Sequence, residues 1–334
     1  MKLSEQFAHQ LQPEYVRKRP GMYVGSSSSV GVYNLIFGLT EELFSDNSYN
    51  EHYIKIKLSD NNVLLFECDH CIDTEDNFSF LVARALSSEF EYTYLNECIV
   101  YNKGELISRT PKIITNGNDT NRIVFSPDKE IFTYENIDYY RVFNQLKELA
   151  QLNSNVTFSL SNDSNKNILN YDCGLDAMLT ESINNSYLQD KQPLNISFTK
   201  DSVNIYVSMI FGFGADVTLS FVNNIKTYDG GTHVQGLISG VFNTFKRYVI
   251  KHHGDDIQIR QKDVIGGLNF VLSVRLENPS FEGSTKRKLA NKEIKSIIND
   301  GIIENLTSIL ETDQSFIDDS KVIQKAEIRK ILSQ

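Results

Sequence analysis

The sequence predicts an α+β protein with two domains in series. Stretches with strand-like alternation and stretches with apolar residues at helical spacing are mixed in both halves of the chain. The length of 334 residues suits two domains, on a guide of roughly 150 residues each. A polar run at 186–193 ends in proline and is the best candidate for a linker. We therefore expect domains at residues 1–190 and 191–334.

The first half should begin with an arm, residues 1–25, that leads into a loop. A helix is predicted at 31–44, because its apolar residues recur at helical spacing. The Asp and Asn residues at 60–62 predict a hairpin turn between two strands. The elements expected in this half are strands at 52–58 and 62–68, a helix at 78–86, strands at 90–101, 105–109 and 122–125, a helix at 139–152, a strand at 156–159, a loop at 161–170 and a helix at 174–185.

The second half should contain a sheet covered by two helices. Three strand patterns come first, followed by a helix that starts near Val234 and by one more strand. Isoleucine and leucine residues at helical spacing from Ile294 onward predict one long helix to the end of the chain. The strands are expected at 194–198, 202–211, 216–223 and 268–276.

Charge and composition exclude several classes of protein. The net charge of −10 argues against strong independent DNA binding, since phosphate neutralisation supplies much of that affinity. Basic residues gather only locally, which leaves room for DNA in a locally basic cavity; they lie at Arg17–Arg19, at Lys246 and Arg247 with Lys251, and at Lys286–Lys288. No apolar run approaches the ~18 residues of a membrane span, and no signal peptide is recognisable. We expect a cytoplasmic protein with no membrane partner.

Cysteine usage does not indicate a disulfide scaffold, since the chain has 4 cysteines. Cys68 and Cys71 form a C-x-x-C pair with a histidine between them. Structural zinc normally takes four ligands, and no second pair with suitable spacing is present. Buried thiols in a strand are the simpler interpretation, and no metal site is expected.

Two stretches stand out for their chemistry. In Tyr228-Asp-Gly-Gly-Thr-His-Val-Gln-Gly236, two glycines allow a tight turn before a helix. In Phe281-Glu-Gly-Ser-Thr-Lys-Arg-Lys-Leu289, Lys286 lies on a glycine-containing loop and could serve as a point charge for a phosphate. Either stretch alone could equally be a solvated turn. His233, at the start of the helix, is expected to be structural.

Together these stretches resemble the amino-terminal region of DNA gyrase B and of its counterpart in topoisomerase IV. Val16-Arg-Lys-Arg-Pro-Gly-Met-Tyr-Val-Gly25 and Asp263-Val-Ile-Gly-Gly-Leu268 look like further signatures, in the same order. The resemblance implies a two-layer Bergerat-type (GHKL) ATPase domain. It also implies a following transducer domain with a left-handed βαβ core, like domain 2 of ribosomal protein S5. It further implies that the chain stops before the metal-binding cleavage (TOPRIM) domain.

The resemblance also places the residues of a nucleotide site, and several are changed. In register, the general-base glutamate of the family becomes Gly38, which has no proton acceptor. Glu42 keeps a carboxylate one turn later, where it could ligate a hard cation. A slip of one turn would instead make Glu42 the base and Asp46 the metal ligand. The simplest interpretation is a solvated helix end.

The remaining parts of that site are also incomplete. Glu67 keeps a carboxyl at the adenine position, but the two glycines that follow in the family are Asp69 and Cys71 here. No glycine occurs between Gly38 and Gly104, so a glycine-rich phosphate lid cannot be built from this segment. Lys286 is retained from the transducer loop. ATP and Mg²⁺ are therefore expected as cofactors only if a rearranged site works, and otherwise none is expected.

The functional hypothesis is a gyrase B-like pseudoenzyme without ATP hydrolysis or strand cleavage. It would act as a homodimeric scaffold, joined through its transducer or arm, or as a regulator or partner of a gyrase or topoisomerase IV subunit. Two alternatives stay open. One is an active ATPase that uses Glu42, Asp46 and Lys286, and the other is a DNA-clamp component with basic residues facing a cavity.

Overall fold

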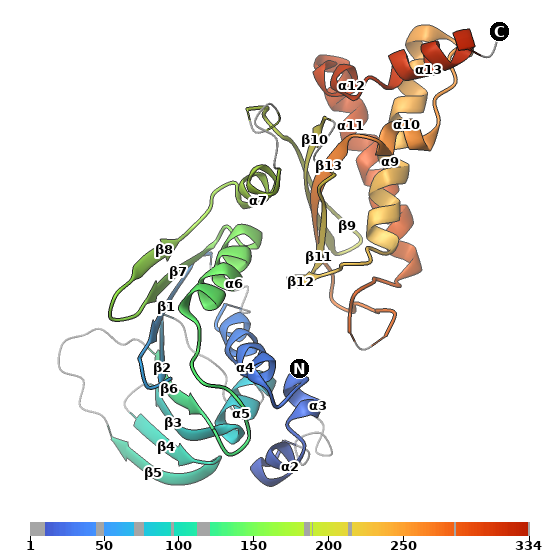
Figure 1. Ribbon diagram of the computed structural model, residues 1–334. Coiled ribbons are helices and arrows are strands. Elements are labelled where there is room, and N and C mark those ends of the chain that lie inside the picture. Colours follow the sequence, from blue (N-terminus) through green and yellow to red (C-terminus); the bar gives the residue numbers. More distant parts are fainter. Residues whose placement is uncertain are drawn as a thin grey trace. The chain divides into compact units, whose positions relative to one another are not determined.

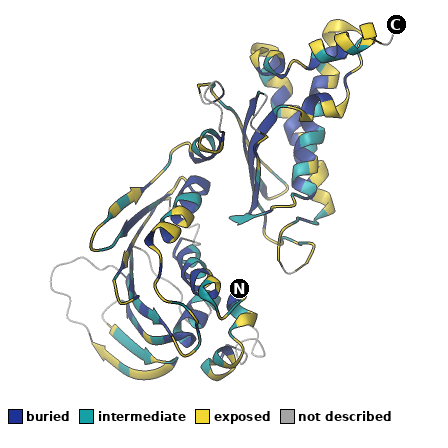
Figure 2. Ribbon diagram, viewed as in Figure 1, coloured by how far each residue is buried: buried dark blue, intermediate teal, exposed yellow. Residues whose placement is uncertain are grey.

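The computed structural model describes residues 11–44, 50–69, 77–94, 97–111, 121–183, 188, 190–212, 216–283 and 285–332. The chain divides into two compact units, Met1–Asp172 and Cys173–Gln334, each with its own hydrophobic core. Both units combine a sheet with helices (Figure 1), so the expected α+β class is confirmed. Buried residues lie on the facing sides of the sheet and its helices in each unit (Figure 2).

The first unit contains an eight-stranded sheet in the order β5-β4-β3-β6-β2-β1-β7-β8 among the described residues. Neighbouring strands are antiparallel except for β1 and β7, which run parallel. The strands are β1 (His52–Leu58), β2 (Leu64–Cys68), β3 (Ser87–Tyr94), β4 (Glu97–Asn102), β5 (Glu105–Pro111), β6 (Asn121–Pro127), β7 (Val156–Ser161) and β8 (Lys166–Leu169). β8 lies where the sequence predicted a loop, because pairing with β7 holds this polar segment extended.

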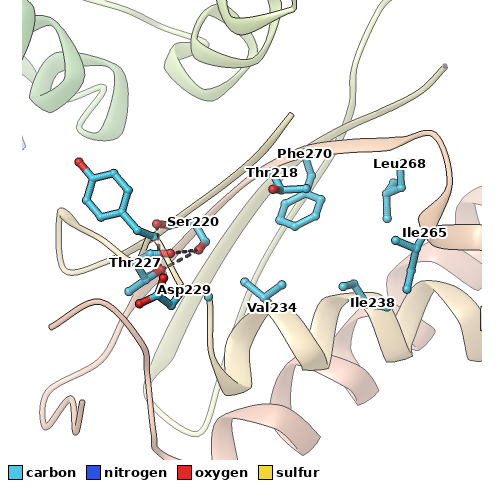
Figure 3. A pocket seen from close by; sticks show the side chains of 11 residues that line it. Thr218, Ser220, Thr227, Asp229, Val234, Ile238, Ile265, Leu268 and Phe270 are labelled. Carbon is cyan, nitrogen blue, oxygen red and sulfur yellow. Dashed lines mark hydrogen bonds between the residues drawn. The ribbon is translucent and has the colours of Figure 1, made fainter. Parts of the chain in front are cut away.

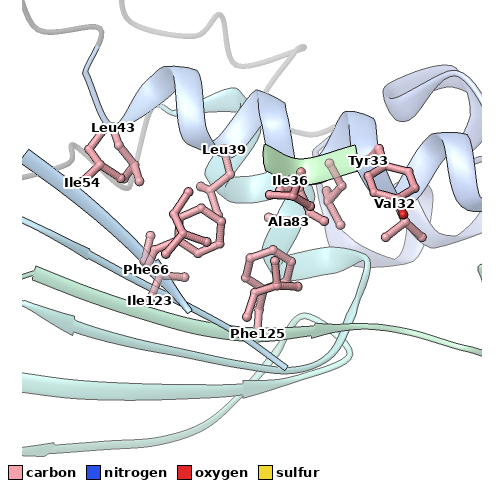
Figure 4. Packing of buried hydrophobic residues seen from close by; sticks show 14 of the residues in the cluster. Val32, Tyr33, Ile36, Leu39, Leu43, Ile54, Phe66, Ala83, Ile123 and Phe125 are labelled. Carbon is pink, nitrogen blue, oxygen red and sulfur yellow. The ribbon is translucent and has the colours of Figure 1, made fainter. Parts of the chain in front are cut away.

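Helices α4 (Ser29–Glu42), α5 (Phe78–Ala85) and α6 (Tyr139–Leu152) lie on one face of this sheet. β1 alternates strictly between buried and exposed residues, which gives the sheet an apolar face for the helices. Ile36 and Leu39 of α4 face Phe66 and the neighbouring strands (Figure 4), and all three side chains are fully buried. The helix begins where the Ser28 side chain accepts a hydrogen bond from Val30 N at 3.3 Å.

The described part of the predicted arm, which precedes α4, is helical. Residues 13–24 form two short helices, α2 (Pro13–Lys18) and α3 (Gly21–Val24). Arg17 ties them to the core, because its guanidinium donates to Ala85 O at 2.9 Å and to Asp128 Oδ2 at 2.6 Å. Arg17 therefore has a structural partner and does not belong to a basic surface run, which local sequence could not reveal.

The second unit contains a five-stranded sheet in the order β12-β11-β13-β10-β9 within the described part of the chain. β11 and β13 are parallel neighbours, and the connection between them carries a long helix. The elements are α7 (Gly174–Ser182), β9 (Leu194–Lys200), β10 (Val203–Phe211), β11 (Thr218–Val222), β12 (Ile225–Lys226), α9 (Thr232–His253), α10 (Gln261–Ile265), β13 (Leu268–Arg275), α11 (Lys292–Thr312), α12 (Ser315–Ser320) and α13 (Val322–Leu332).

α7 belongs to this second unit, although the expected boundary between residues 190 and 191 follows it. The carboxylate of Asp176 in α7 accepts hydrogen bonds from Ser208 of β10 at 2.6 Å and from Asn195 of β9 at 2.8 Å. These bonds hold α7 against the sheet, so the compact units divide before α7 at Cys173.

The predicted long C-terminal helix is present as α11, but the prediction that it runs to the end of the chain is wrong, because α11 ends at Thr312 and two further helices follow. Asp313 is extended, with φ −138° and ψ 114°, which ends α11, and its carboxylate accepts a hydrogen bond from Ser315 N at 2.8 Å in the turn before α12. α13 then packs on α10, where Arg329 donates to both carboxylate oxygens of Asp263 at 2.8 Å. Helical spacing continues across the break, which is why periodicity alone missed it.

α9 and α11 lie side by side on one face of the sheet and approach closely at two glycines of α9 (Figure 1). A Cβ on Gly236 would lie 2.8 Å from Lys295 O, and a Cβ on Gly240 would lie 2.7 Å from Ile302 Cβ. Only glycine fits at such distances. Spaced four residues apart, the two glycines set how near the helices pack.

Candidate nucleotide site and basic loop

Gly38 lies on α4 where the resemblance predicts a catalytic carboxylate. A Cβ built on Gly38 would lie 3.4 Å from Ser79 Oγ, so the first turn of α5 packs directly against this point of α4. The resemblance predicts a glycine-rich lid before this helix, and the sequence has no glycine between Gly38 and Gly104. The side of α4 at Gly38 is therefore in contact with protein.

Glu42, one turn later, joins α4 to the start of α5. Asn77 Nδ2 donates to Glu42 Oε2 at 3.0 Å, and Ser79 Oγ donates to Glu42 Oε1 at 3.4 Å. Asn77 is also the N-cap of α5, since its Oδ1 accepts from Phe80 N at 2.8 Å. Both carboxylate oxygens of Glu42 are thus used in a helix-to-helix contact. Asp46, its predicted companion, lies outside the described residues.

Glu67 lies on β2 and forms an ion pair with Lys55 of β1 at 2.5 Å. Its neighbours Phe66 and Cys68 are buried among the residues that face the helices, so alternation places Glu67 on the other face of the sheet. The structure therefore does not bring Glu67 and Glu42 together. The β2 side chain on the helical face at this end is Cys68, whose Sγ lies 3.9 Å from Asn121 O.

Of the predicted C-x-x-C pair, the structure describes Cys68, whereas Cys71 lies outside the described residues. Cys68 is 3% exposed, as expected for a buried thiol in a strand. In the part of the chain that the structure describes, no three His, Cys, Asp or Glu side chains come together as metal ligands.

The two stretches singled out in the sequence meet in the second unit. Leu289 N donates to Gly230 O at 3.1 Å, and Thr232 N donates to Leu289 O at 3.1 Å. Gly231 has φ 139°, and a Cβ there would lie 2.4 Å from Leu289 O. Glycine is therefore required at position 231 by the close backbone of the basic loop, residues 281–289, whereas a Cβ on Gly230 would meet only the Val234 side chain at 3.4 Å. Both stretches were recognisable in the sequence, but their pairing was not, because they lie about fifty residues apart.

Arg287 forms a second connection between the basic loop and the glycine turn. Its guanidinium donates to the two carboxylate oxygens of Asp229 at 2.8 and 3.0 Å. Hydrogen bonding from Arg287 lowers the pKa of the Asp229 carboxyl below its ordinary value, as expected for a carboxylate paired with a guanidinium. Arg287 also lies over the ring of Tyr228, 5.1 Å from its centroid.

Lys286 is exposed beside this anchor. It adopts φ 53°, and its backbone N–H donates to Gly283 O at 3.3 Å. The loop thus presents the Lys286 side chain to solvent next to a fixed residue. Lys286 belongs to the second unit, whereas Glu42 and Glu67 belong to the first.

His233 lies in the core beneath the glycine turn and is 0% exposed. Its Nε2 is 3.0 Å from Thr227 Oγ1, which in turn lies 2.6 Å from Ser220 Oγ. Burial lowers the pKa of His233 to about 4, so the imidazole is neutral at pH 7. The residue is a structural histidine at a helix start, in agreement with the sequence-based interpretation.

Acidification is expected to destabilise the protein through His233. The unfolded chain takes up this proton near pH 6.5, whereas the folded chain takes it up only near pH 4. Stability from the neutral ring is present above pH 6.5 and falls as the pH drops towards 4, by about 2 kcal/mol between pH 7 and 5. The free energy of unfolding at pH 7 and at pH 5 can be measured by chemical denaturation of the wild type, His233→Gln and the exposed control His253→Gln. The extra loss of stability at pH 5 should appear in the wild type and in His253→Gln, and should be absent from His233→Gln. Parallel pH curves for all three proteins would contradict the assignment.

Comparison with known proteins places these features in a family context. A family model described as DNA gyrase B matches residues 174–331. The DNA gyrase B protein of Clostridium acetobutylicum is 28% identical over 351 aligned positions, covering 89% of this chain and 54% of that protein. The mitochondrial gyrase B protein of Arabidopsis thaliana is 26% identical, covering 89% of this chain and 48% of that protein. The chain resembles the amino-terminal region of DNA gyrase B.

Solved structures agree with this resemblance at the level of the fold. The 43K ATPase domain of Thermus thermophilus gyrase B, in complex with an aminocoumarin, has a TM-score of 0.83 at 22% identity, and the match covers 98% of this chain and 99% of that one. The topoisomerase IV ATP-binding domain of Francisella tularensis has a TM-score of 0.74 at 24% identity, with 93% and 96% covered. The expected fold, a GHKL ATPase-like unit followed by a transducer-like unit, is confirmed.

The gyrase B-like chain spans about half the length of the curated relatives that it matches. Within its described residues, no helix combines the length and the apolar character needed to cross a bilayer.

Proposed function

We propose that this gyrase B-like chain does not hydrolyse ATP and serves as a dimeric scaffold, or as a regulator of a type II topoisomerase through one of its subunits. The two units differ in which functional features they keep. The first keeps its scaffold and loses the chemistry, whereas the second keeps the anchored loop that carries Lys286.

The arrangement at Gly38 carries this proposal. Hydrolysis needs a group that orients and deprotonates the attacking water, and glycine offers none. Ser79 lies against Gly38, and the carboxylate one turn later, Glu42, is hydrogen-bonded to Asn77 and Ser79. Glu42 could act on a nucleotide only through the remaining lone pairs of two oxygens that already accept hydrogen bonds from the start of α5.

Calorimetric titration and an ATPase assay test the proposal directly. ATP and a non-hydrolysable analogue, each with Mg²⁺, would be titrated into the chain, with the 43K ATPase domain of Thermus thermophilus gyrase B as the positive control. We expect no turnover above background. Micromolar binding with turnover would reject the proposal, and loss of that turnover in Glu42→Gln would then support the rearranged site.

A stability measurement on Glu42 separates a structural role from a catalytic one. Glu42→Ala leaves Asn77 and Ser79 without their acceptor, so the free energy of unfolding should fall by about 1–2 kcal/mol. Glu105→Ala removes an exposed carboxylate of the same unit and serves as a control that should change it by less. Equal values for the two variants would show that Glu42 does not hold α5.

Association with a partner is tested separately. Sedimentation of the purified chain reports whether it forms a homodimer without nucleotide. Titration with purified gyrase and topoisomerase IV subunits in the same instrument reports a complex. A monomer that binds none of these proteins would exclude the scaffold and regulator roles.

A further inference from the structure

The second unit contains a cavity of about 350 Å³ between its sheet and the first half of α9 (Figure 3). This volume lies at the lower end of the range for small-molecule sites, about 300–1,000 Å³. Every lining residue that the structure describes belongs to the second unit. They are Thr218, Ser220, Thr227, Tyr228, Asp229, Gly230, Val234, Ile238, Ile265, Leu268 and Phe270.

The body of the cavity is apolar. Val234 and Ile238 project from α9 towards Phe270 of β13 (Figure 3). Leu268 and Phe270 are buried, whereas Ile265 of α10 is 46% exposed at the rim. An apolar group can therefore enter from solvent and bury its surface between α9 and the sheet.

The buried hydroxyl groups at the other end already have partners within the protein (Figure 3). Thr227 Oγ1 donates to Ser220 O at 2.9 Å, and Ser220 Oγ donates to Thr227 O at 3.2 Å. The carboxylate of Asp229 accepts two hydrogen bonds from the Arg287 guanidinium, at 2.8 and 3.0 Å. Neither these hydroxyls nor this ion pair would compensate a charged ligand for the water that it gives up, so the cavity favours an uncharged one.

Thr218 lines the cavity with a residue whose backbone lies at the edge of a strand. Phe270 N donates to Val217 O at 2.9 Å, so Val217 faces β13. Thr227 N donates to Ser220 O at 2.8 Å on the opposite side of β11. Because the backbone groups of successive residues in a strand point to alternate sides, Thr218 directs its N–H and C=O away from β13, as Ser220 does.

This edge is open beside Thr218 in the described part of the sheet. The neighbouring strand on that side, β12, pairs with Phe221 and Val222 of β11 and does not reach Thr218. One N–H and one C=O at a strand edge match the C=O and N–H of an amide, as when an extended peptide adds to a sheet. The cavity thus combines an apolar body with an edge that can hydrogen-bond to an amide.

We propose that this cavity binds a small uncharged molecule that carries an apolar group and an amide. The apolar group lies between α9 and β13, and the amide pairs with the backbone of Thr218. The site belongs wholly to the second unit, so it does not depend on whether the first unit binds nucleotide.

The test follows the isoleucine methyl signals of the whole chain by NMR during titration with N-acetylphenylalaninamide, which has a phenyl ring, two amides and no charge. The signals of Ile238 and Ile265, which line the cavity, should shift saturably. The signal of Ile250, which is on the same helix, 44% exposed and outside the lining, should stay constant.

Two related compounds separate the parts of the ligand. Propylbenzene, which has no amide, should bind about fivefold more weakly, on the scale of one hydrogen bond. N-acetylphenylalanine, whose carboxylate is charged, should also bind more weakly.

Variants of Thr218 test the contact with the amide. Thr218→Pro removes the outward N–H and leaves the bonds to β13, because proline is tolerated where the N–H faces away from the sheet. It should weaken binding of N-acetylphenylalaninamide about fivefold and leave binding of propylbenzene unchanged. Thr218→Val keeps the N–H, so this matched control should bind both compounds like the wild type.

A second pair of variants tests the apolar body independently. Ile238→Trp fills the cavity and should abolish the shift of the Ile265 signal with both compounds. Ile250→Trp is its control and should leave that shift unchanged. Near-ultraviolet circular dichroism verifies that each variant is folded, and either pair of variants is decisive if the other does not fold.

Three results would overturn the proposal or one of its parts. No saturable shift in the wild type, or an unchanged shift in folded Ile238→Trp, would exclude the cavity as a binding site. Equal binding of N-acetylphenylalaninamide and N-acetylphenylalanine would overturn the preference for an uncharged ligand. Equal binding of propylbenzene, or unchanged affinity in Thr218→Pro, would overturn the contact between the amide and the strand edge.

Discussion

Gly240→Leu is expected to unfold the second unit or bring it close to unfolding, with a loss of roughly 3 kcal/mol or more. A Cβ alone would lie 2.7 Å from Ile302 Cβ and 3.0 Å from Asn299 O, so part of the clash is with helix backbone. Asn243 Nδ2 also donates to Asn299 Oδ1 at 2.9 Å, which holds α9 and α11 at this distance. The two helices would have to separate along their crossing to admit the leucine.

Hydrogen exchange followed by mass spectrometry measures this effect for each unit. Peptides from α9 and α11 in Gly240→Leu should exchange much faster, while peptides from the first unit keep the wild-type rate. The adjacent Ser239→Leu adds the same side chain at a less buried position of the same helix and is the control. If both variants exchange like the wild type, the helices are not held as closely as the structure indicates.

Gly231→Ala is expected to release the basic loop from the start of α9 and to cost about 1–3 kcal/mol, on the scale of strain at a positive φ. Gly231 has φ 139°, and its Cβ would lie 2.4 Å from Leu289 O and 2.5 Å from Leu289 N. The hydrogen bonds from Leu289 N to Gly230 O and from Thr232 N to Leu289 O should therefore break.

Gly283→Ala is a control that separates backbone strain at a positive φ from the clash with Leu289. Gly283 also has a positive φ of 83°, but nothing lies within 4 Å of its Cβ position. Exchange at the Leu289 amide should accelerate in Gly231→Ala and stay near the wild-type rate in Gly283→Ala. Similar acceleration in both would mean that backbone strain, and not contact with Leu289, holds the loop.

Local pattern alone was sufficient for most of the elements. The helix predicted at 139–152 matches α6 at both ends, because its apolar residues recur at helical spacing and Asp138 supplies an N-cap, bonding Arg141 N at 3.0 Å. β1 was equally clear, since buried and exposed residues alternate along it. Where periodicity continued across a break, as between α11 and α12, the prediction failed.

The contacts of the candidate site residues could not be predicted from the sequence. Glu67 was chosen for its carboxyl, yet the pairing of β2 with β1 sets which face that carboxyl occupies and gives it Lys55 as a partner. Glu42 was a candidate ligand at a helix end, yet the position of Asn77 decides its contacts. Strand register and helix packing depend on residues distant in the chain, so no local spacing encodes them.

The sequence by itself determined the order of most helices and strands, the two-part α+β organisation and the absence of a carboxylate at Gly38, because each follows from residue type and local periodicity. Only the tertiary structure decided that Ser79 contacts Gly38, that Arg17 reaches Asp128, and that the glycine turn is hydrogen-bonded to the basic loop at Leu289. The physical reason is that these contacts join segments far apart in the chain. Their energies come from close packing and from hydrogen bonds that exist only after the chain has folded.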